Sequence, residues 1–260
     1  MSLRERLAEG RTVRLDGGLS TALEELGADI ADELWTARVL RDQPELVLAA
    51  HRAFVDAGAE IVISASYQAP HELLGRSVQI ARQAGVLVAA SVAPYGAVLA
   101  GGQEYTGDYE VPSGWHERRL RELLDADCIA IETQPRVDEA AAIVRALEAL
   151  DGPEAWVTFT CRDGASTGHG EPIEDAVAAV ASPRVVAVGV NCTAPEFVDE
   201  LLGRIAAVTD LPLVAYPNAG RSYDAVTKTW SGEMSSCTFA GATLVGGCCG
   251  WGPAAVARLP

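Results

Sequence analysis

The sequence has few aromatic residues, which make up 6% of its 260 positions. A core built from this chain must therefore rely on Ala, Val, Leu and Ile. No run of apolar residues approaches the ~20 that a membrane-spanning helix needs. The first residues, MSLRERLAEGRTVRLDGG, have scattered charges and lack the apolar stretch of a signal peptide. We expect a cytoplasmic protein that does not enter the membrane.

Basic residues are also scarce relative to acidic ones, and the formal net charge is −16. Nucleic-acid binding needs a basic surface, so this charge argues against a nucleic-acid partner. The excess of acid favours solubility, with attraction of a cationic substrate as the second interpretation. Six cysteines in a chain without a secretion signal do not indicate a disulfide framework. They are expected to be buried apolar residues, metal ligands or nucleophiles.

No linker, low-complexity tract or close internal repeat divides the sequence, so we expect one domain over residues 1–260. A short apolar run, a Gly, Pro or polar turn and a helical stretch recur along it. The apolar runs occupy residues 12–18, 60–66, 86–94, 128–134, 155–161, 185–192, 211–218 and 242–249.

Most of these runs are continuously hydrophobic, which is typical of parallel strands covered by helices. Helical spacing of apolar residues follows in stretches such as 44–58, 137–150 and 194–208. Eight such units in ~250 residues predict an α/β fold, a single (β/α)8 TIM barrel. A doubly wound sheet is the alternative, but it more usually has six strands, and no GxGxxG turn follows the first run.

In such a barrel, the active site lies at the carboxyl ends of the strands. Polar, acidic and thiol groups gather at these predicted ends, while the strand bodies are apolar. The groups are Asp16-Gly17-Gly18, Ser66-Tyr67-Gln68, Pro94-Tyr95-Gly96, Glu132-Thr133, Cys161, Asn191-Cys192, Tyr216-Pro217-Asn218 and Cys248-Cys249.

Three of these cysteines, Cys192, Cys248 and Cys249, end the sixth and eighth runs and are expected to meet at one mouth. Three thiolates form a soft donor set that favours Zn²⁺ and leaves a fourth position open for a substrate. A lone cysteine at a strand end is more often a buried core residue, but the GGCCG and NCT motifs together favour a metal site. A thiol bound at the open position is deprotonated and stays nucleophilic, so it can attack a methyl group on a sulfonium.

The chain resembles the homocysteine S-methyltransferases and their betaine-using relatives over nearly its whole length. The resemblance rests on LDGGLSTALEELG, SASYQAP, SVAPYGAVLAGGQEYTGDY, IAIETQPRVDEA, WVTFTCRDG, AVGVNCTAP, AYPNAGRSYDA and GGCCGWGP. The pairing of GVNCTAP with GGCCG is highly specific. The third motif looks like the branch that uses a sulfonium methyl donor.

The resemblance implies that the three cysteines are zinc ligands and catalytic. It also implies that Asp16, the Gly17 and Gly18 amides and Glu132 hold the amino-acid part of homocysteine. Tyr67 is expected near the metal, where it caps the ion in the absence of substrate, and Asn191 is expected to be a neighbouring pocket residue. The structural alternatives are a simple βα turn at Asp16, an ion pair at Glu132 and rim packing at Tyr67.

We therefore expect a zinc-dependent enzyme that makes methionine from homocysteine, with S-methylmethionine favoured over S-adenosylmethionine as donor. Two alternatives are an enzyme that acts on selenohomocysteine or another small thiol, and a non-catalytic zinc- or thiol-binding barrel. The segment 66–85 is shorter than is usual in this family, and this bears on donor choice and subunit contacts. The sequence does not indicate an oligomeric state.

Overall fold

The computed structural model describes residues 2–260 except 31–35, 100–101, 221, 225–228 and 236. Parts of two motifs quoted above, at 100–101 and at 221 and 225, thus lie outside the described residues. Eight strands form one parallel sheet in the order β1-β10-β7-β6-β5-β4-β3-β2. The strands are β1 (Val13–Arg14), β2 (Ile61–Ile63), β3 (Leu87–Val92), β4 (Cys128–Gln134), β5 (Ala155–Phe159), β6 (Val185–Asn191), β7 (Leu213–Tyr216) and β10 (Ala242–Val245).

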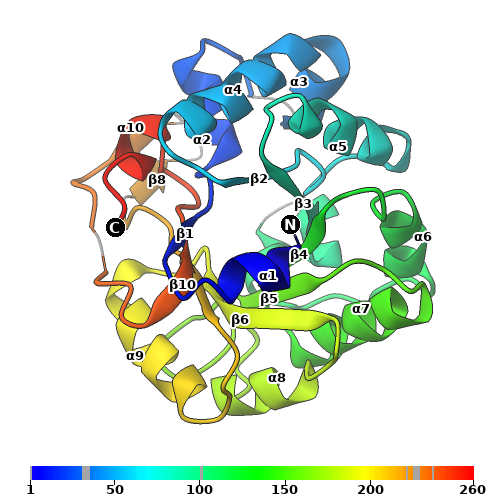
Figure 1. Ribbon diagram of the computed structural model, residues 1–260, viewed down its shortest axis with the longest axis vertical. Coiled ribbons are helices and arrows are strands. Elements are labelled where there is room, and N and C mark those ends of the chain that lie inside the picture. Colours follow the sequence, from blue (N-terminus) through cyan, green and yellow to red (C-terminus); the bar gives the residue numbers. More distant parts are fainter. Residues whose placement is uncertain (1, 31–35, 100–101, 221, 225–228, 236) are drawn as a thin grey trace.

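The sheet curls into a nearly closed barrel surrounded by helices (Figure 1). Its first and last strands in spatial order, β1 and β2, are joined by one parallel bridge between Leu15 and Ile61. A backbone hydrogen bond of 2.8 Å from Glu60 N to Arg14 O adds to this seam. Each of the eight predicted apolar runs contains one of these strands, so the (β/α)8 prediction is confirmed.

Alternate strand residues face two different apolar layers. The barrel interior contains Ala89, Ala130, Trp156, Ala187 and Val214 among others. Their neighbours along the strands pack outward against the helices. Because both faces of every strand are buried, the strands are continuously apolar in sequence.

The helices cover the outside of the barrel, as the ring in Figure 1 shows. The predicted stretch 44–58 forms α4, with Pro44 in the first turn, where its missing N–H is not needed. The helices are α1 (Leu3–Leu7), α2 (Leu19–Glu25), α3 (Thr36–Asp42), α4 (Pro44–Asp56), α5 (Leu74–Arg82), α6 (Trp115–Arg121), α7 (Val137–Ala149), α8 (Ile173–Ala179), α9 (Pro195–Ala206) and α10 (Pro253–Val256). Three short 3-10 turns are η1 (His71–Leu73), η2 (Tyr95–Val98) and η3 (Gln103–Tyr105). None of the described helices is long and apolar enough to cross a membrane.

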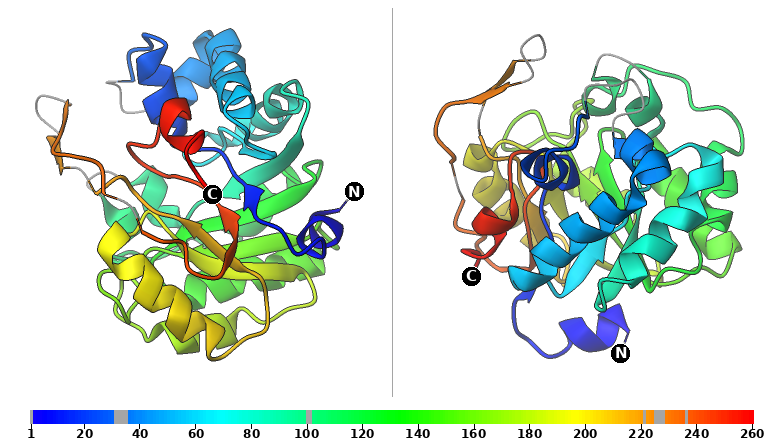
Figure 2. Two further views of the ribbon diagram at one scale, coloured as in Figure 1. Left: turned by 60° about the vertical axis from the view of Figure 1, so that its left-hand side comes forward. Right: turned by 90° about the horizontal axis from the view of Figure 1, so that it is seen from above.

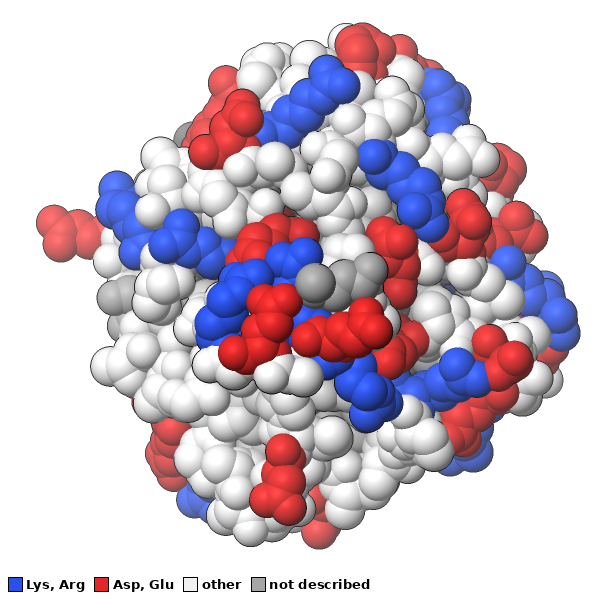
Figure 3. Space-filling view, in the orientation of Figure 1, with Lys and Arg blue, Asp and Glu red and all other residues white. Residues whose placement is uncertain are grey.

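The short helix α1 closes the amino-terminal end of the barrel. Its Leu3 and Leu7 are buried in the same apolar cluster as the interior strand residues, including Cys128 at the start of β4. Cys128 is thus a core residue. Acidic and basic side chains are interspersed over this face (Figure 3), and Arg6 pairs with Glu60 at 2.6 Å.

An antiparallel hairpin outside the barrel was not predicted. It consists of β8 (Ser222–Asp224) and β9 (Thr229–Ser231), which follow β7. Figure 2 shows the hairpin projecting from the molecule at the end opposite α1.

Candidate active site and metal centre

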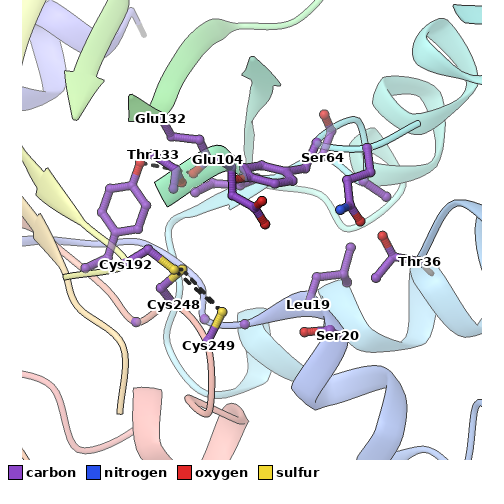
Figure 4. Close-up of a pocket in the computed structure, with 18 of the residues that line it drawn as sticks. Leu19, Ser20, Thr36, Ser64, Glu104, Glu132, Thr133, Cys192, Cys248 and Cys249 are labelled. Atoms are coloured by element: carbon purple, nitrogen blue, oxygen red, sulfur yellow. Dashed lines mark hydrogen bonds between the residues drawn. The ribbon is translucent and has the colours of Figure 1, made fainter. Parts of the chain in front are cut away.

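The sulfurs of Cys192, Cys248 and Cys249 lie within 4.8 Å of one another at the carboxyl ends of the strands. The Sγ–Sγ distances are 2.7 Å between Cys192 and Cys248, 3.6 Å between Cys192 and Cys249, and 4.0 Å between Cys248 and Cys249. All three are free thiols. Figure 4 shows them at one wall of a cavity. The predicted juxtaposition of the three cysteines is therefore present in the fold.

The local backbone turns both adjacent cysteines toward the cavity. A Cβ at Gly247 would collide with the Trp251 ring, so only glycine fits there. Gly250 has a φ of 82°, which turns the chain directly after Cys249. Cys192 itself has a φ of 49°, in the left-handed region that non-glycine residues rarely adopt. Such strained residues often mark functional sites.

The three thiols fit a tetrahedral zinc ion. With Zn–S bonds near 2.3 Å, two sulfurs on one ion are about 3.8 Å apart. Two of the three observed distances are close to this value, and the third requires Cys192 and Cys248 to separate by about 1 Å. Hydrogen bonds with Cys192, and to a lesser extent with Cys248, hold the pKa of the Cys249 thiol well below its ordinary value. The cluster therefore already favours a thiolate.

Two buried carboxylates lie beside the cluster. The Glu132 carboxylate accepts hydrogen bonds from Ser91 Oγ at 2.5 Å and from Tyr216 OH at 3.1 Å. Burial raises the pKa of Glu132 to about 7, although these two hydroxyls oppose the shift. No arginine pairs with it in the described part of the chain, which removes the ion-pair alternative.

The Asp16 carboxylate closes the seam of the barrel and faces Glu132. Its Oδ2 accepts a hydrogen bond of 2.8 Å from Ile63 N, whereas its buried Oδ1 has no partner among the described residues. Burial raises the pKa of Asp16 well above its ordinary value, and the charge of Glu132 adds to the shift. Asp16 does not itself line the cavity, but two neighbouring acids, one with an unpartnered oxygen, favour a cation such as an ammonium group.

The cavity has a volume of about 850 Å³, including its open mouth. Among the described residues that line it, Glu104 and Glu132 are the charged side chains apart from the cysteines. The lining residues are Gly17, Gly18, Leu19, Ser20, Thr36, Ile63, Ser64, Ala65, Tyr67, Gln68, Glu104, Tyr105, Glu132, Thr133, Cys192, Tyr216, Gly247, Cys248 and Cys249.

The other predicted site residues take different positions relative to this cavity. Gly17 and Gly18 line it, but the Gly18 N–H donates to Trp251 O at 2.9 Å and is therefore occupied. No described residue accepts from the Gly17 N–H. Tyr67 lines the cavity, as expected.

Asn191 is fully buried and does not line the cavity. Its Oδ1 accepts from Thr133 N at 2.7 Å and its Nδ2 donates to Thr133 Oγ1 at 2.8 Å. Both atoms of the amide are thus used to hold Thr133, whose φ is 56°. The structure therefore places Asn191 behind the pocket wall, at the end of β6, where it holds the residue that follows Glu132 in β4.

Among the lining residues that were not predicted are Glu104 and Tyr105 on η3. The Tyr105 hydroxyl lies 3.6 Å from Cys192 Sγ. Within the described residues, the Tyr67 hydroxyl makes no such contact with a cysteine of the cluster. Glu104 and Tyr105 belong to the EYTGDY motif, which distinguishes the branch but indicates no role by itself. The sequence analysis expected site residues only at the carboxyl ends of the strands. Because η3 lies well beyond the end of β3, this expectation did not include its residues.

Comparison with known proteins gives one consistent result. Residues 13–260 match the family model for homocysteine S-methyltransferase. The chain is 41% identical to the homocysteine S-methyltransferase of Escherichia coli (strain K12), covering 99% of this chain and 97% of that protein. It is 37% identical to the selenocysteine Se-methyltransferase of Brassica oleracea var. italica, covering 99% and 91%.

The fold agrees with a solved structure. The homocysteine methyltransferase MmuM from Escherichia coli, in its metallated form, superposes with a TM-score of 0.87 at 38% identity, covering 98% of this chain and 97% of that one. The alignment with the first relative spans 300 positions, which is 40 more than this chain has. The relative therefore has at least that many residues without a counterpart here.

Proposed function

This chain belongs to the homocysteine S-methyltransferase family, and from that premise we propose that it transfers a methyl group from a sulfonium donor to homocysteine, using one zinc ion held by Cys192, Cys248 and Cys249. The chain is an enzyme, so the non-catalytic alternative is wrong. The observation that carries the proposal is the convergence of three free thiols on one wall of a cavity whose other charged groups are acids.

The chemistry of the donor set supports zinc. Three thiolates and an open fourth position are typical of a catalytic zinc site, and the similar solved protein is known in a metallated form. When bound, the ion keeps a substrate thiol deprotonated at neutral pH while leaving it nucleophilic.

The residues beside the cluster fit the rest of homocysteine. Its ammonium group fits between Asp16 and Glu132, where Asp16 Oδ1 has no other partner. Its carboxylate fits the free Gly17 N–H, as backbone amides suit anions. We propose that Tyr67 and Asn191 act around this subsite, Tyr67 in the lining and Asn191 through its two hydrogen bonds to Thr133.

The transfer step is a single displacement. The homocysteine sulfur forms a bond to the methyl carbon while the bond between that carbon and the donor sulfur breaks. The electron pair of the broken bond stays on the donor sulfur, which becomes a neutral thioether, and the thiol proton is lost before the attack. No general base is strictly required, because the thiolate is already formed.

S-methylmethionine is the favoured donor and S-adenosylmethionine the second. A second acceptor, a selenol such as selenohomocysteine, is favoured by one observation, the similarity to a selenocysteine Se-methyltransferase. A soft metal site accepts a selenolate as readily as a thiolate. We further propose that residues 1–260 form one domain, which acts in the cytoplasm, where the six free cysteines stay reduced.

The test is metal analysis of protein purified under reducing, chelator-free conditions, combined with assays of methionine formation from homocysteine and each sulfonium donor. We expect close to one zinc per chain and turnover with S-methylmethionine. Cys249→Ser is expected to lose most zinc and activity, because a hydroxyl is a poor ligand for this site.

Cys237→Ser is the matched control, since Cys237 is half-buried and lies outside the cluster. It should keep both zinc and activity. Zinc below about a tenth of an equivalent in the wild type would refute the metal site. A Cys249→Ser protein with normal zinc and turnover would remove that residue from it.

A further inference from the structure

Glu104 is a carboxylate inside the active cavity to which the reaction described above gives no role. Its side chain enters the cavity from η3, and the residue is only 8% exposed. Figure 4 shows the carboxylate between the cysteine cluster and the wall formed by Leu19, Ser20 and Thr36. Glu104 thus lies inside the cavity, close enough to the cluster for the charge of Cys249 to act on its carboxyl.

The negative charge of Glu104 is not compensated by the protein. Among the described residues, no side chain donates a hydrogen bond to Glu104 or forms an ion pair with it. Its own backbone N–H is the one described polar group that contacts the carboxylate. Glu132, in contrast, has two hydroxyl donors. Burial raises the pKa of Glu104, which reflects the same lack of a partner. A buried and unpaired carboxylate is costly unless a ligand supplies a positive charge.

The position of Glu104 is built into the fold. A Cβ at Gly96 would lie 2.7 Å from Glu104 N, and one at Gly168 would collide with Tyr105 O, so η3 packs directly on two glycines. The segment is further held by Tyr109, whose hydroxyl donates to the buried Glu139 at 2.7 Å. Close backbone packing on both sides indicates that the carboxylate is held in place before any substrate binds.

We propose that Glu104 is the counter-charge of the sulfonium in the methyl donor and thereby selects a positively charged donor. This inference rests on the proposed function. Homocysteine brings one positive charge, its ammonium, for which Asp16 and Glu132 are available. A sulfonium donor brings a further charge close to the reacting methyl group, and Glu104 is the other acid among the described residues that line the cavity.

The kinetic effect of this contact follows from the charge change in the reaction. The donor sulfur is positive when it binds and neutral after the methyl group has left. A fixed carboxylate therefore stabilises the bound donor more than the transition state, in which the charge is already partly lost. Removing the carboxylate should weaken donor binding and leave kcat unchanged or higher.

The test is Glu104→Gln, which keeps the shape of the side chain and removes its charge. We expect KM for S-methylmethionine to rise at least tenfold, with kcat, homocysteine KM and zinc content close to wild type. Asp108→Asn is the matched control, because it removes a charge from the same segment at a side chain that is 74% exposed. It should leave the donor KM unchanged.

A second measurement separates the sulfonium from the donor's ammonium group. Trimethylsulfonium ion, used as an inhibitor that competes with the donor, should lose most of its potency against Glu104→Gln. Equal inhibition of wild type and variant would overturn the inference, as would an unchanged donor KM. If Glu104→Gln does not fold, Glu104→Asp keeps the charge but withdraws it by one methylene, and it should raise the donor KM by a smaller factor.

The proposed function and the proposed role of Glu104 are refuted by different results. A wild-type protein that makes no methionine from any sulfonium donor refutes the proposed function. An active wild type whose donor KM is indifferent to Glu104 refutes only the role of this residue.

Discussion

Glu132 lies inside the barrel, where burial raises the pKa of its carboxyl to about 7. In the unfolded chain the same group has an ordinary pKa near 4.5. Between these values the folded protein binds a proton that the unfolded chain has already released. Stability from this group is therefore fully present below pH 4.5 and is lost as the pH rises through 7.

Glu132→Gln removes this dependence, because the amide does not titrate. The free energy of unfolding of the variant, relative to wild type, should increase between pH 5 and pH 7.5 by up to about 3 kcal/mol. Urea titrations of both metal-free proteins at several pH values measure it. A constant difference across this range would show that Glu132 is not the group responsible. Homocysteine binding should be weak in the variant at every pH, because the ammonium loses one partner.

At the residue scale, the sequence predicted that the three cysteines lie close together, but it predicted only some of the acids near them. Cys192, Cys248 and Cys249 follow apolar runs directly, so the strand-end rule brings them together. Glu104 and Tyr105 follow no strand end, and only the folded course of the chain after β3 carries them into the cavity. The second role of Asn191, which holds Thr133 at a positive φ, depends on side-chain contacts that no spacing reveals.

At the scale of elements, the continuous apolar runs predicted all eight barrel strands, because burial on both faces leaves a clear pattern. The hairpin of β8 and β9 was missed because its segments are short and mostly polar, SYD and TWS, and show no apolar run. The short α1 was not predicted either, since five residues are too few for helical periodicity to show.

Helix α1 provides a test of packing far from the chemistry. Leu3 is 1% exposed and fills the amino-terminal end of the barrel, so Leu3→Ala should lower the free energy of unfolding by about 2–4 kcal/mol. Leu26→Ala is the control, because Leu26 is 43% exposed, and its effect should stay within about 0.5 kcal/mol. Denaturant unfolding measures both. Since α1 lies at the end opposite the cavity, kcat of the folded Leu3→Ala protein should be unchanged, and a large fall in kcat would contradict this separation.

At the scale of the whole molecule, the cysteine cluster spans the barrel mouth. Cys192 follows β6, the other two cysteines follow β10, and β7 lies between these strands. A metal ion on the cluster would therefore link β6 to β10 across β7, at the end of the barrel opposite α1.

Removal of the metal should lower the thermal stability of the whole barrel. An ion present at about 1,000 times its Kd stabilises a fold by about 4 kcal/mol, which corresponds to a fall in Tm of roughly 10 °C on removal in a protein of this size. Thermal unfolding with and without a strong chelator measures the effect. Cys248→Ser should show little response to the chelator, and an equal response in this variant would place the ion elsewhere.

The site joins the two ends of the polypeptide. The Gly247 N–H donates to Asp16 O at 3.1 Å, and the Gly18 N–H donates to Trp251 O at 2.9 Å, so the first turn of the barrel is completed by residues near position 250. During synthesis on the ribosome, the chain presents Asp16, Glu132 and Cys192 long before Cys248 and Cys249 emerge. A nascent or prematurely terminated chain thus holds one of the three thiols and an open barrel. With the proposed site incomplete, we expect such a chain neither to hold the ion nor to start methyl transfer, so that activity appears only when translation has passed residue 249.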